Sequence, residues 1–198
     1  MAHGEDHGRD VSVRIAVYGG SFDPPHIAHV LVASWALAMG EVDRVLVLPA
    51  LKHALGKSAG ASFEQRLAMC ELAFETLPGV TVDPLERELG APSRTYNTLQ
   101  ALGERHPGAR FRVVIGADIL GETERWYRWN DIAALAPPLV VGRAGYSPPD
   151  SRQVVMPEVS STRIRACLAR GESVDTWVPA AVRGHIERHG LYCAEPEP

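Results

Sequence analysis

Residues 13–29 read VRIAVYGGSFDPPHIAH. The apolar run that opens this stretch is short and bounded by turn-forming residues, which predicts a buried β-strand. Gly19 and Gly20 follow at once, and without Cβ atoms they let the backbone turn sharply and approach a bound group closely. Two prolines then keep a helix from beginning before His26. The predicted order is therefore strand, glycine turn and helix.

A helix rich in alanine, leucine and valine is predicted from His26 to Met39. His26 and His29 are three residues apart and share one face of its first turn, so both imidazoles can point at a group bound there. Free N–H groups and a partial positive charge attract phosphate to a helix N-terminus. The plainer alternative is a simple turn followed by solvated or capping histidines.

Composition limits the classes of protein to consider. The 198 residues predict one domain over 13–193, with a disordered tail at 1–12 and a short tail at 194–198. A net charge of −4 without a basic stripe argues against nucleic-acid binding, and no apolar run approaches the ~20 residues that span a bilayer. The three cysteines show no C-x-x-C pairing, which favours a reducing, cytoplasmic location.

Strands and helices alternate along the rest of the chain. Further strands are predicted at 42–49, 80–82, 110–115, 139–141 and 154–156, and further helices at 62–77, from 93–99 to about 106, from 160 onward and at 179–189. Ser62 and Gln65 have the spacing of a capping box. The alternation predicts an α/β fold with a doubly wound, mostly parallel, Rossmann-like sheet that carries helices on both faces.

Several polar residues follow predicted strand ends, where open α/β sheets bind ligands. Lys52 and Lys57 lie in the loop at 50–61 and are either ligand-binding or simply solvated. Asp118 follows the strand at 110–115, where it either contacts a ligand or caps the next helix.

An anion site is also predicted at the helix that opens with Ser160, Ser161 and Thr162. Hydroxyls, free N–H groups and the guanidinium of Arg165 all donate there, although an N-cap with solvated arginines would look the same.

Trp126, Tyr127 and Trp129 place three aromatic residues within four positions. We expect the two tryptophans to share one helix face. Such residues are usually core or anchor residues, but a flat ring beside a pocket can also stack on a planar ligand.

Together these motifs resemble the nucleotidyltransferase superfamily, whose signature is (T/S)-F-D-P-x-H-x-G-H. From Val13 to Tyr192 the chain looks like the bacterial nicotinate-nucleotide adenylyltransferases. The landmarks that carry the resemblance are GGSFDPPH, Gln65-Arg66, Ser93-x-Thr95, Gly116-x-Asp118, Trp126-x-x-Trp129, Arg143-x-Gly145-Tyr146, Ser160-Ser161-Thr162-x-Ile164-Arg165 and Gly190-Leu191-Tyr192.

The resemblance implies transfer of the adenylyl group of ATP to nicotinate mononucleotide, giving deamido-NAD and pyrophosphate. It implies ATP contacts from the Gly19-Gly20-Ser21-Phe22 backbone, Lys57, Asp118, Ser160, Ser161 and Thr162, with His26, His29 and Arg165 as catalytic residues. It implies an acceptor site at Arg94, Thr95, Trp126 and Tyr127, with Trp126 stacked on the nicotinate ring. Mg²⁺ would neutralise the triphosphate, held mostly by phosphate oxygens and water. The oligomeric state is left open, with a homo-oligomer among the alternatives.

Three positions depart from the family pattern. Ala28 stands where glycine is usual, and its methyl is expected to crowd adenosine. Arg94 replaces a tyrosine beside the acceptor site, where a cation favours an anionic acceptor. The usual Pro-Pro-His-Lys loop is absent, which leaves Lys57 or Lys52 as its counterpart. The alternatives are a different acceptor, namely nicotinamide mononucleotide or phosphopantetheine, and a nucleotide-binding paralogue without turnover.

Overall fold

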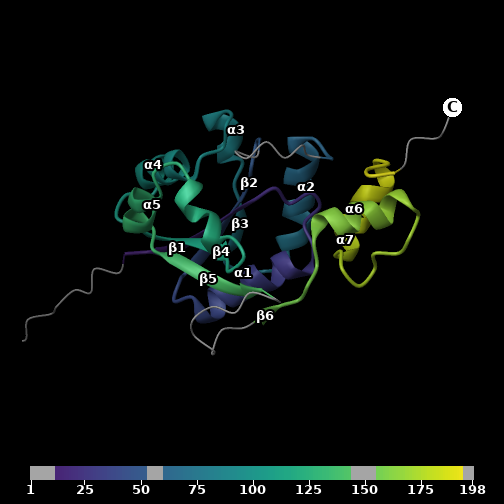
Figure 1. The fold of residues 1–198 in the computed structure, drawn as a ribbon, viewed down its shortest axis with the longest axis horizontal. Helices are drawn as coiled ribbons and strands as arrows, with labels where there is room; N and C mark the ends of the chain where they lie inside the picture. Colours follow the sequence, from purple (N-terminus) through teal and green to yellow (C-terminus); the bar gives the residue numbers. More distant parts are fainter. Residues whose placement is uncertain (1–11, 53–59, 144–154, 194–198) are drawn as a thin grey trace, which may run out of the picture.

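Six parallel strands form one sheet in the order β3-β2-β1-β4-β5-β6 in the computed structural model (Figure 1). The structure describes residues 12–52, 60–143 and 155–193. Both predicted tails, apart from Ser12, lie outside these ranges. The strands are β1 (Arg14–Gly20), β2 (Arg44–Pro49), β3 (Val80–Val82), β4 (Arg110–Gly116), β5 (Pro138–Arg143) and β6 (Val155–Met156). All six predicted strands are present.

Alternate residues of the central strands feed two separate cores, one on each face of the sheet. Ala16 and Val114 enter the first core, whereas Val17 and Val113 enter the second. This alternation follows from the two-residue period of a strand. Because both faces are covered, the strands are nearly continuous in apolar residues, as parallel strands usually are.

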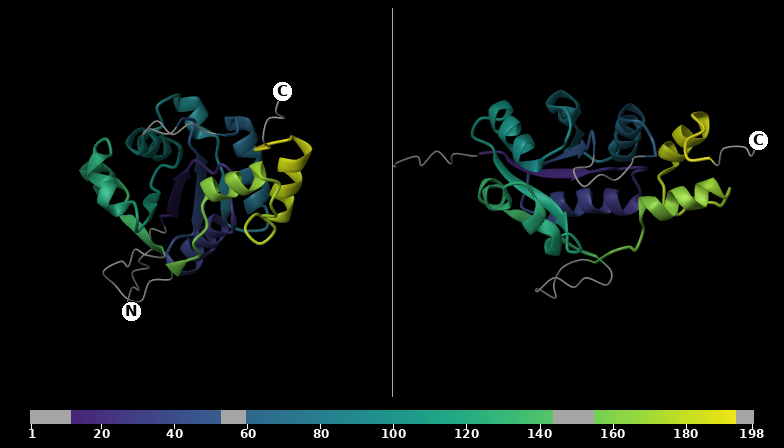
Figure 2. Two further views of the ribbon diagram at one scale, coloured as in Figure 1. Left: turned by 45° about the vertical axis from the view of Figure 1, so that its right-hand side comes forward. Right: turned by 45° about the horizontal axis from the view of Figure 1, so that its top comes forward.

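The helices divide between the same two faces. They are α1 (Ile27–Met39), α2 (Phe63–Phe74), α3 (Leu85–Leu89), α4 (Thr95–Arg105), the 3₁₀ helix η1 (Leu120–Arg125), α5 (Trp129–Leu135), α6 (Ser161–Ala169) and α7 (Ala180–Arg188). Residues of α1, α2, α6 and α7 build the first core, and residues of α3, α4 and α5 build the second. Figures 1 and 2 show α4 and α5 together at one end of the molecule and α2, α6 and α7 at the other.

The helices that connect β1, β2 and β3 cover one face of the sheet, and those that connect β3, β4 and β5 cover the other. β1 and β4 are neighbours in the sheet, and the strands that follow each of them lie on opposite sides of this pair. Ligands of open α/β sheets bind at such a switch point, beyond the carboxyl ends of the strands. The predicted doubly wound sheet is therefore confirmed. Among the described residues, no helix has the length and apolar character needed to cross a bilayer.

Two local predictions were wrong, and one helix was not predicted. The segment after β3 contains the short helix α3, which its polar composition did not suggest. Ser62 caps α2 as expected, but the Gln65 side chain bonds His185 at 2.5 Å instead of completing a capping box. Trp126 and Trp129 do not share a helix face: η1 ends before Trp126 and α5 starts at Trp129.

The left-handed conformation of Arg128, with φ of 60°, explains that break between η1 and α5. The two indole rings of Trp126 and Trp129 still meet edge to face, at 5.7 Å between centroids.

The three cysteines differ in access to solvent, which gives a simple test of the fold. Cys70 and Cys167 are buried and Cys193 is exposed, and none forms a disulfide. Burial also raises the pKa of the Cys70 thiol, and a protonated thiol is a poor nucleophile. We expect a thiol reagent to label one cysteine in the native protein and three after denaturation. Mass spectrometry should find the native label on Cys193, and rapid labelling of Cys70 would contradict the packing of α2.

Candidate active site

Two cavities meet at the carboxyl ends of β1 and β4, the switch point of the sheet. The larger, of about 460 Å³, lies toward α3, α4 and the 125–127 segment, and we call it the acceptor-side cavity. The smaller, of about 250 Å³, lies over the start of α1, and we call it the helix-side cavity. Gly19 and Val114 line both cavities. A molecule in one cavity would therefore face a molecule in the other across Gly19.

The loop after β1 is shaped by the ring of Phe22 as much as by its glycines. Gly19 is open to the cavities, and a Cβ on it would meet no atom within 4 Å. A Cβ on Gly20 would lie 3.0 Å from the buried Phe22 ring. The residue with a left-handed backbone is Phe22 itself, with φ of 48°. The predicted turn is present, but the positive φ falls on Phe22 instead of on a glycine.

His26 and His29 stand together at the start of α1, and both line the helix-side cavity. Their rings stack at 3.7 Å between centroids, with an interplanar angle of 24°. The backbone N–H of His26 donates to Nδ1 of His29 at 3.1 Å. A neutral imidazole that accepts at Nδ1 carries its proton on Nε2, so His29 presents a donor at that nitrogen. The two histidines therefore lie together as predicted, and His29 also caps the helix, which was the alternative.

Asp23, a motif residue for which no role was predicted, connects four parts of the chain. The residue is 2% exposed. Its carboxylate accepts from the backbone N–H groups of Gly60 at 2.6 Å and Ala61 at 3.1 Å, and from the Tyr192 hydroxyl at 2.7 Å. Arg165 donates to the Asp23 carbonyl at 2.6 Å and lies 3.5 Å from the carboxylate. Burial, with this bond to Asp23, raises the pKa of Tyr192.

The side chain of Arg66 also supports the loop after β1. It is buried, and its guanidinium donates to the carbonyls of Ser21 at 2.8 Å, Ala61 at 3.3 Å and Leu51 at 3.4 Å. Burial lowers its pKa, which the nearby charge of Asp23 partly offsets. Arg66 therefore holds the ends of β1 and β2 together, and the Gln65-Arg66 landmark has a structural reason.

The predicted anion site at α6 packs directly against the loop after β1. Ser160 caps the helix by accepting from the Arg163 N–H at 3.3 Å, and Ser161 donates to the Pro24 carbonyl at 2.9 Å. Thr162 is exposed and lies 3.5 Å from a guanidinium nitrogen of Arg165. The fold thus brings the two predicted phosphate sites together, although they are more than 130 residues apart in sequence.

The predicted acceptor residues gather around the larger cavity. Arg94, Thr95, Trp126 and Tyr127 all line it. The Arg94 guanidinium lies 4.5 Å from the centre of the Tyr127 ring, and Arg128 lies 4.0 Å from that of Tyr96. The two tyrosine rings meet edge to face. These contacts tie the start of α4 to the 126–128 segment at the rim of the cavity.

Asp118 and Ala28 lie in the wall of the helix-side cavity, as predicted for residues near the nucleotide. A Cβ on Gly116 would lie 2.3 Å from the Asp118 carboxylate, so only glycine at that position lets the carboxylate fold back over the strand end. The capping alternative is not supported, since η1 has Ile119 at its N-cap.

Of the two predicted lysines, the structure describes only Lys52. Lys52 is exposed and lines neither cavity, and its carbonyl accepts from the Ser93 N–H at 3.4 Å. Lys57 lies outside the described residues, as do Gly145 and Tyr146. The choice between Lys52 and Lys57 therefore stays open.

Sequence reasoning missed two buried acidic residues. Asp23 was visible as part of the motif, but its partners are 37 to 169 residues away. Glu86 lines the acceptor-side cavity, but it lies in a polar segment whose sequence gives no motif that would single it out. Arg66 was noted only as part of a helix start.

Known proteins resemble this chain in sequence and in fold. The family model described as cytidylyltransferase-like matches residues 17–167. A protein of Anaeromyxobacter sp. (strain K) is 49% identical over 181 residues, which cover 90% of this chain and 96% of that protein. A protein of Myxococcus xanthus (strain DK1622) is 40% identical over 182 residues, which cover 91% and 95%. Both carry the name "probable nicotinate-nucleotide adenylyltransferase".

A solved structure shares the fold. Plasmodium falciparum nicotinic acid mononucleotide adenylyltransferase complexed with NaAD matches with a TM-score of 0.77 at 20% identity, over 91% of this chain and 97% of that one. From the family model and the two bacterial relatives together, this chain belongs to the cytidylyltransferase-like family and, within it, to the nicotinate-nucleotide adenylyltransferases.

Proposed function

We propose that the chain transfers the adenylyl group of ATP to nicotinate mononucleotide, with ATP over the helix-side cavity and the acceptor in the larger one. The observation that carries this assignment is the junction at Gly19, where a histidine pair and a cavity of nucleotide size meet at the switch point. A phosphate oxygen of the acceptor attacks the α-phosphorus of ATP. The bond to the β-phosphate oxygen breaks, and pyrophosphate leaves.

The chain's own residues act by position and charge. The open backbone at Gly19 lets the two phosphates approach each other. His26 and the Nε2–H of His29 stabilise charge that develops on the transferring phosphate. Arg165 and Thr162 at the start of α6 hold the leaving pyrophosphate, with Arg165 aimed by Asp23. No covalent intermediate forms in this scheme, because the acceptor's own phosphate is the nucleophile.

Mg²⁺ fits this site as part of the ATP substrate instead of as a resident ion. Within the described residues, no group of three or more histidine, cysteine or acidic side chains could hold a metal. Asp23, the buried acid nearest the loop, already accepts three hydrogen bonds. Mg²⁺ prefers phosphate oxygens and water and neutralises charge on the triphosphate. The three free cysteines support the expected cytoplasmic location.

Trp126 is the proposed stacking surface for the nicotinate ring, with Thr95 and nearby backbone amides at the ring's carboxylate. Its indole lines the acceptor-side cavity and is braced by Trp129. We expect Trp126→Ala to raise the KM for nicotinate mononucleotide about 10- to 30-fold and to leave the KM for ATP nearly unchanged, because a stacked aromatic pair is lost from one substrate only. Trp126→Phe, which keeps a ring, should change the acceptor KM only a few-fold. An equal rise in both KM values would contradict stacking.

Pyrophosphate release with ATP and Mg²⁺ tests the proposed function. Nicotinate mononucleotide, nicotinamide mononucleotide and phosphopantetheine should be compared as acceptors. A strong preference for nicotinate mononucleotide is expected, since Arg94 adds positive charge at the cavity. Preference for another acceptor would overturn the substrate assignment and make Arg94 the first residue to vary. Measurable ATP binding with no release from any acceptor would favour a nucleotide-binding protein without turnover.

A further inference from the structure

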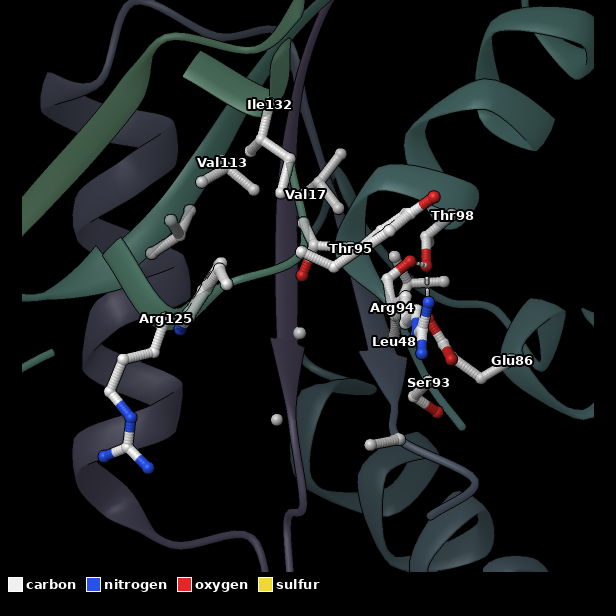
Figure 3. A pocket seen from close by; sticks show the side chains of 16 residues that line it. Val17, Leu48, Glu86, Ser93, Arg94, Thr95, Thr98, Val113, Arg125 and Ile132 are labelled. Atoms are coloured by element: carbon white, nitrogen blue, oxygen red, sulfur yellow. Dashed lines mark hydrogen bonds between the residues drawn. The ribbon is translucent and has the colours of Figure 1, made fainter. Parts of the chain in front are cut away.

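Glu86 is a buried acid, and within the described residues only one of its two carboxylate oxygens accepts a hydrogen bond. It belongs to α3, is 5% exposed and lines the acceptor-side cavity. Its Oε1 accepts from the Thr98 hydroxyl at 2.5 Å. Its Oε2 is buried and has no hydrogen-bond partner within the described part of the chain. Figure 3 shows Glu86 beside Thr98, Arg94 and Ser93 on one wall, with Arg125 across from them.

Among the residues that the structure describes, no hydrogen bond to Oε2 explains why this acid is kept in the cavity wall. An unsatisfied carboxylate oxygen away from water is costly, so buried acids normally have paired oxygens. Arg94, a cationic residue of the same wall, lies over the Tyr127 ring and makes no hydrogen bond to Oε2 of Glu86. Glu88, two residues along the same helix, is exposed and bonds Arg105. The helix α3 therefore carries one acid on the protein surface, Glu88, and one that faces the cavity, Glu86.

The chemistry of the acceptor selects what Oε2 can bind. A pyridine mononucleotide with a carboxylate has two anionic ends, its phosphate and its ring carboxylate. Both ends accept hydrogen bonds and repel a carboxylate. The only donors between them are the ribose hydroxyls. An ionised carboxylate that accepts from a hydroxyl makes one of the stronger hydrogen bonds available to a neutral group.

We propose that Glu86 binds the acceptor ribose, with Oε2 accepting a hydrogen bond from one of its hydroxyls and Thr98 holding Oε1. The assignment rests on the proposed function, because it takes a pyridine mononucleotide as the occupant of the larger cavity. It makes Glu86 a specificity-determining residue that selects ribose over deoxyribose and keeps the sugar between the two anionic ends.

The test pairs a change in the protein with a change in the substrate. Wild type and Glu86→Gln are assayed with nicotinate mononucleotide and with its 2′-deoxy and 3′-deoxy analogues. Wild type should lose about 10- to 100-fold in kcat/KM on one analogue, as expected for a lost hydrogen bond to a charged group. Glu86→Gln should act poorly on the ribose substrate yet discriminate only about 3-fold, because the coupling is gone. Glu88→Gln, a matched change on the surface, should behave as wild type.

Each result other than these counts against the role. Wild type that uses both analogues as well as ribose would overturn it, whether or not the variant folds. A variant that discriminates as strongly as wild type would also overturn it, and so would one that alters the preference for nicotinate over nicotinamide, which would move Glu86 to the ring. The absence of any wild-type turnover with nicotinate mononucleotide would instead overturn the proposed function.

Discussion

Replacing His26 with alanine is expected to lower kcat by about 100- to 1,000-fold, the loss typical of removing one donor that stabilises transition-state charge. His26 lines the helix-side cavity, at the junction where we place the attacked phosphorus. The KM for ATP should change much less, because the scheme uses this donor mainly in the transition state. Single-turnover rates of pyrophosphate release measure the loss directly.

The variant should leave the rest of the site in place. The group that fixes His29 is the backbone N–H of residue 26, which alanine retains. Added imidazole should therefore restore part of the rate by entering the vacated space. His189→Ala, an exposed histidine at the end of α7, is the matched control and should keep wild-type activity. A loss below about 5-fold for His26→Ala would contradict a catalytic role.

A labelling experiment on the wild-type protein separates electrostatic from covalent catalysis. If a histidine were the nucleophile, ATP labelled in its α-phosphate would leave label on the protein after an alkaline quench, since phosphoramidates survive base. We expect no such label, because the acceptor phosphate supplies the nucleophile. Label on His26 or His29 would overturn the mechanism and leave the substrate assignment intact.

The local parts of this fold could be predicted well from the sequence. A short apolar strand, a turn and a proline-limited helix start are set by neighbouring residues, so β1 and α1 fall where 13–39 indicates. The histidine pair follows from the same helical spacing. Alternating strands and helices were enough to predict the two-faced sheet, and the switch point then located both cavities.

A short helix, a local break between two helices and the contacts between distant residues could not be predicted. The helix α3 has only five residues and is polar, so it carries too little periodicity to distinguish it from a loop. The tryptophan pair was misjudged because Arg128 adopts a left-handed conformation, which no local rule requires of arginine. Asp23 and Glu86 gain their meaning from partners or cavities that only the folded chain brings near them.

Replacing Asp23 with alanine is expected to lower the free energy of unfolding by about 3 to 5 kcal/mol, the usual cost of removing one member of a buried charged network. The change leaves the N–H groups of Gly60 and Ala61 and the hydroxyl of Tyr192 without their acceptor. It also removes the carboxylate that lies 3.5 Å from Arg165, which keeps its bond to the backbone carbonyl of residue 23. Ala61 is in the first core and Tyr192 packs against it, so water compensates poorly for these two donors.

Urea denaturation followed by circular dichroism measures this loss. For m-values of 1–3 kcal/mol/M, the midpoint should fall by roughly 2 M with an unchanged slope. Asp43→Ala is the matched control, because Asp43 also pairs with an arginine, Arg14, but both side chains are more than 40% exposed. That pair should contribute less than about 1 kcal/mol.

Tyr192→Phe removes one hydrogen bond to Asp23 and should lower the free energy of unfolding by about 1 kcal/mol. Comparison with the loss in Asp23→Ala tests whether the bonds to Asp23 act together.

If Asp23→Ala unfolds as readily as Asp43→Ala, the carboxylate is not the link between the β1 loop, the 60–61 segment, α6 and Tyr192. If instead stability falls and kcat falls with it in the folded fraction, Asp23 also positions Arg165 for pyrophosphate. The Asp23→Asn variant separates the two effects, since an amide keeps one acceptor oxygen for the backbone but loses the charge that orients the guanidinium.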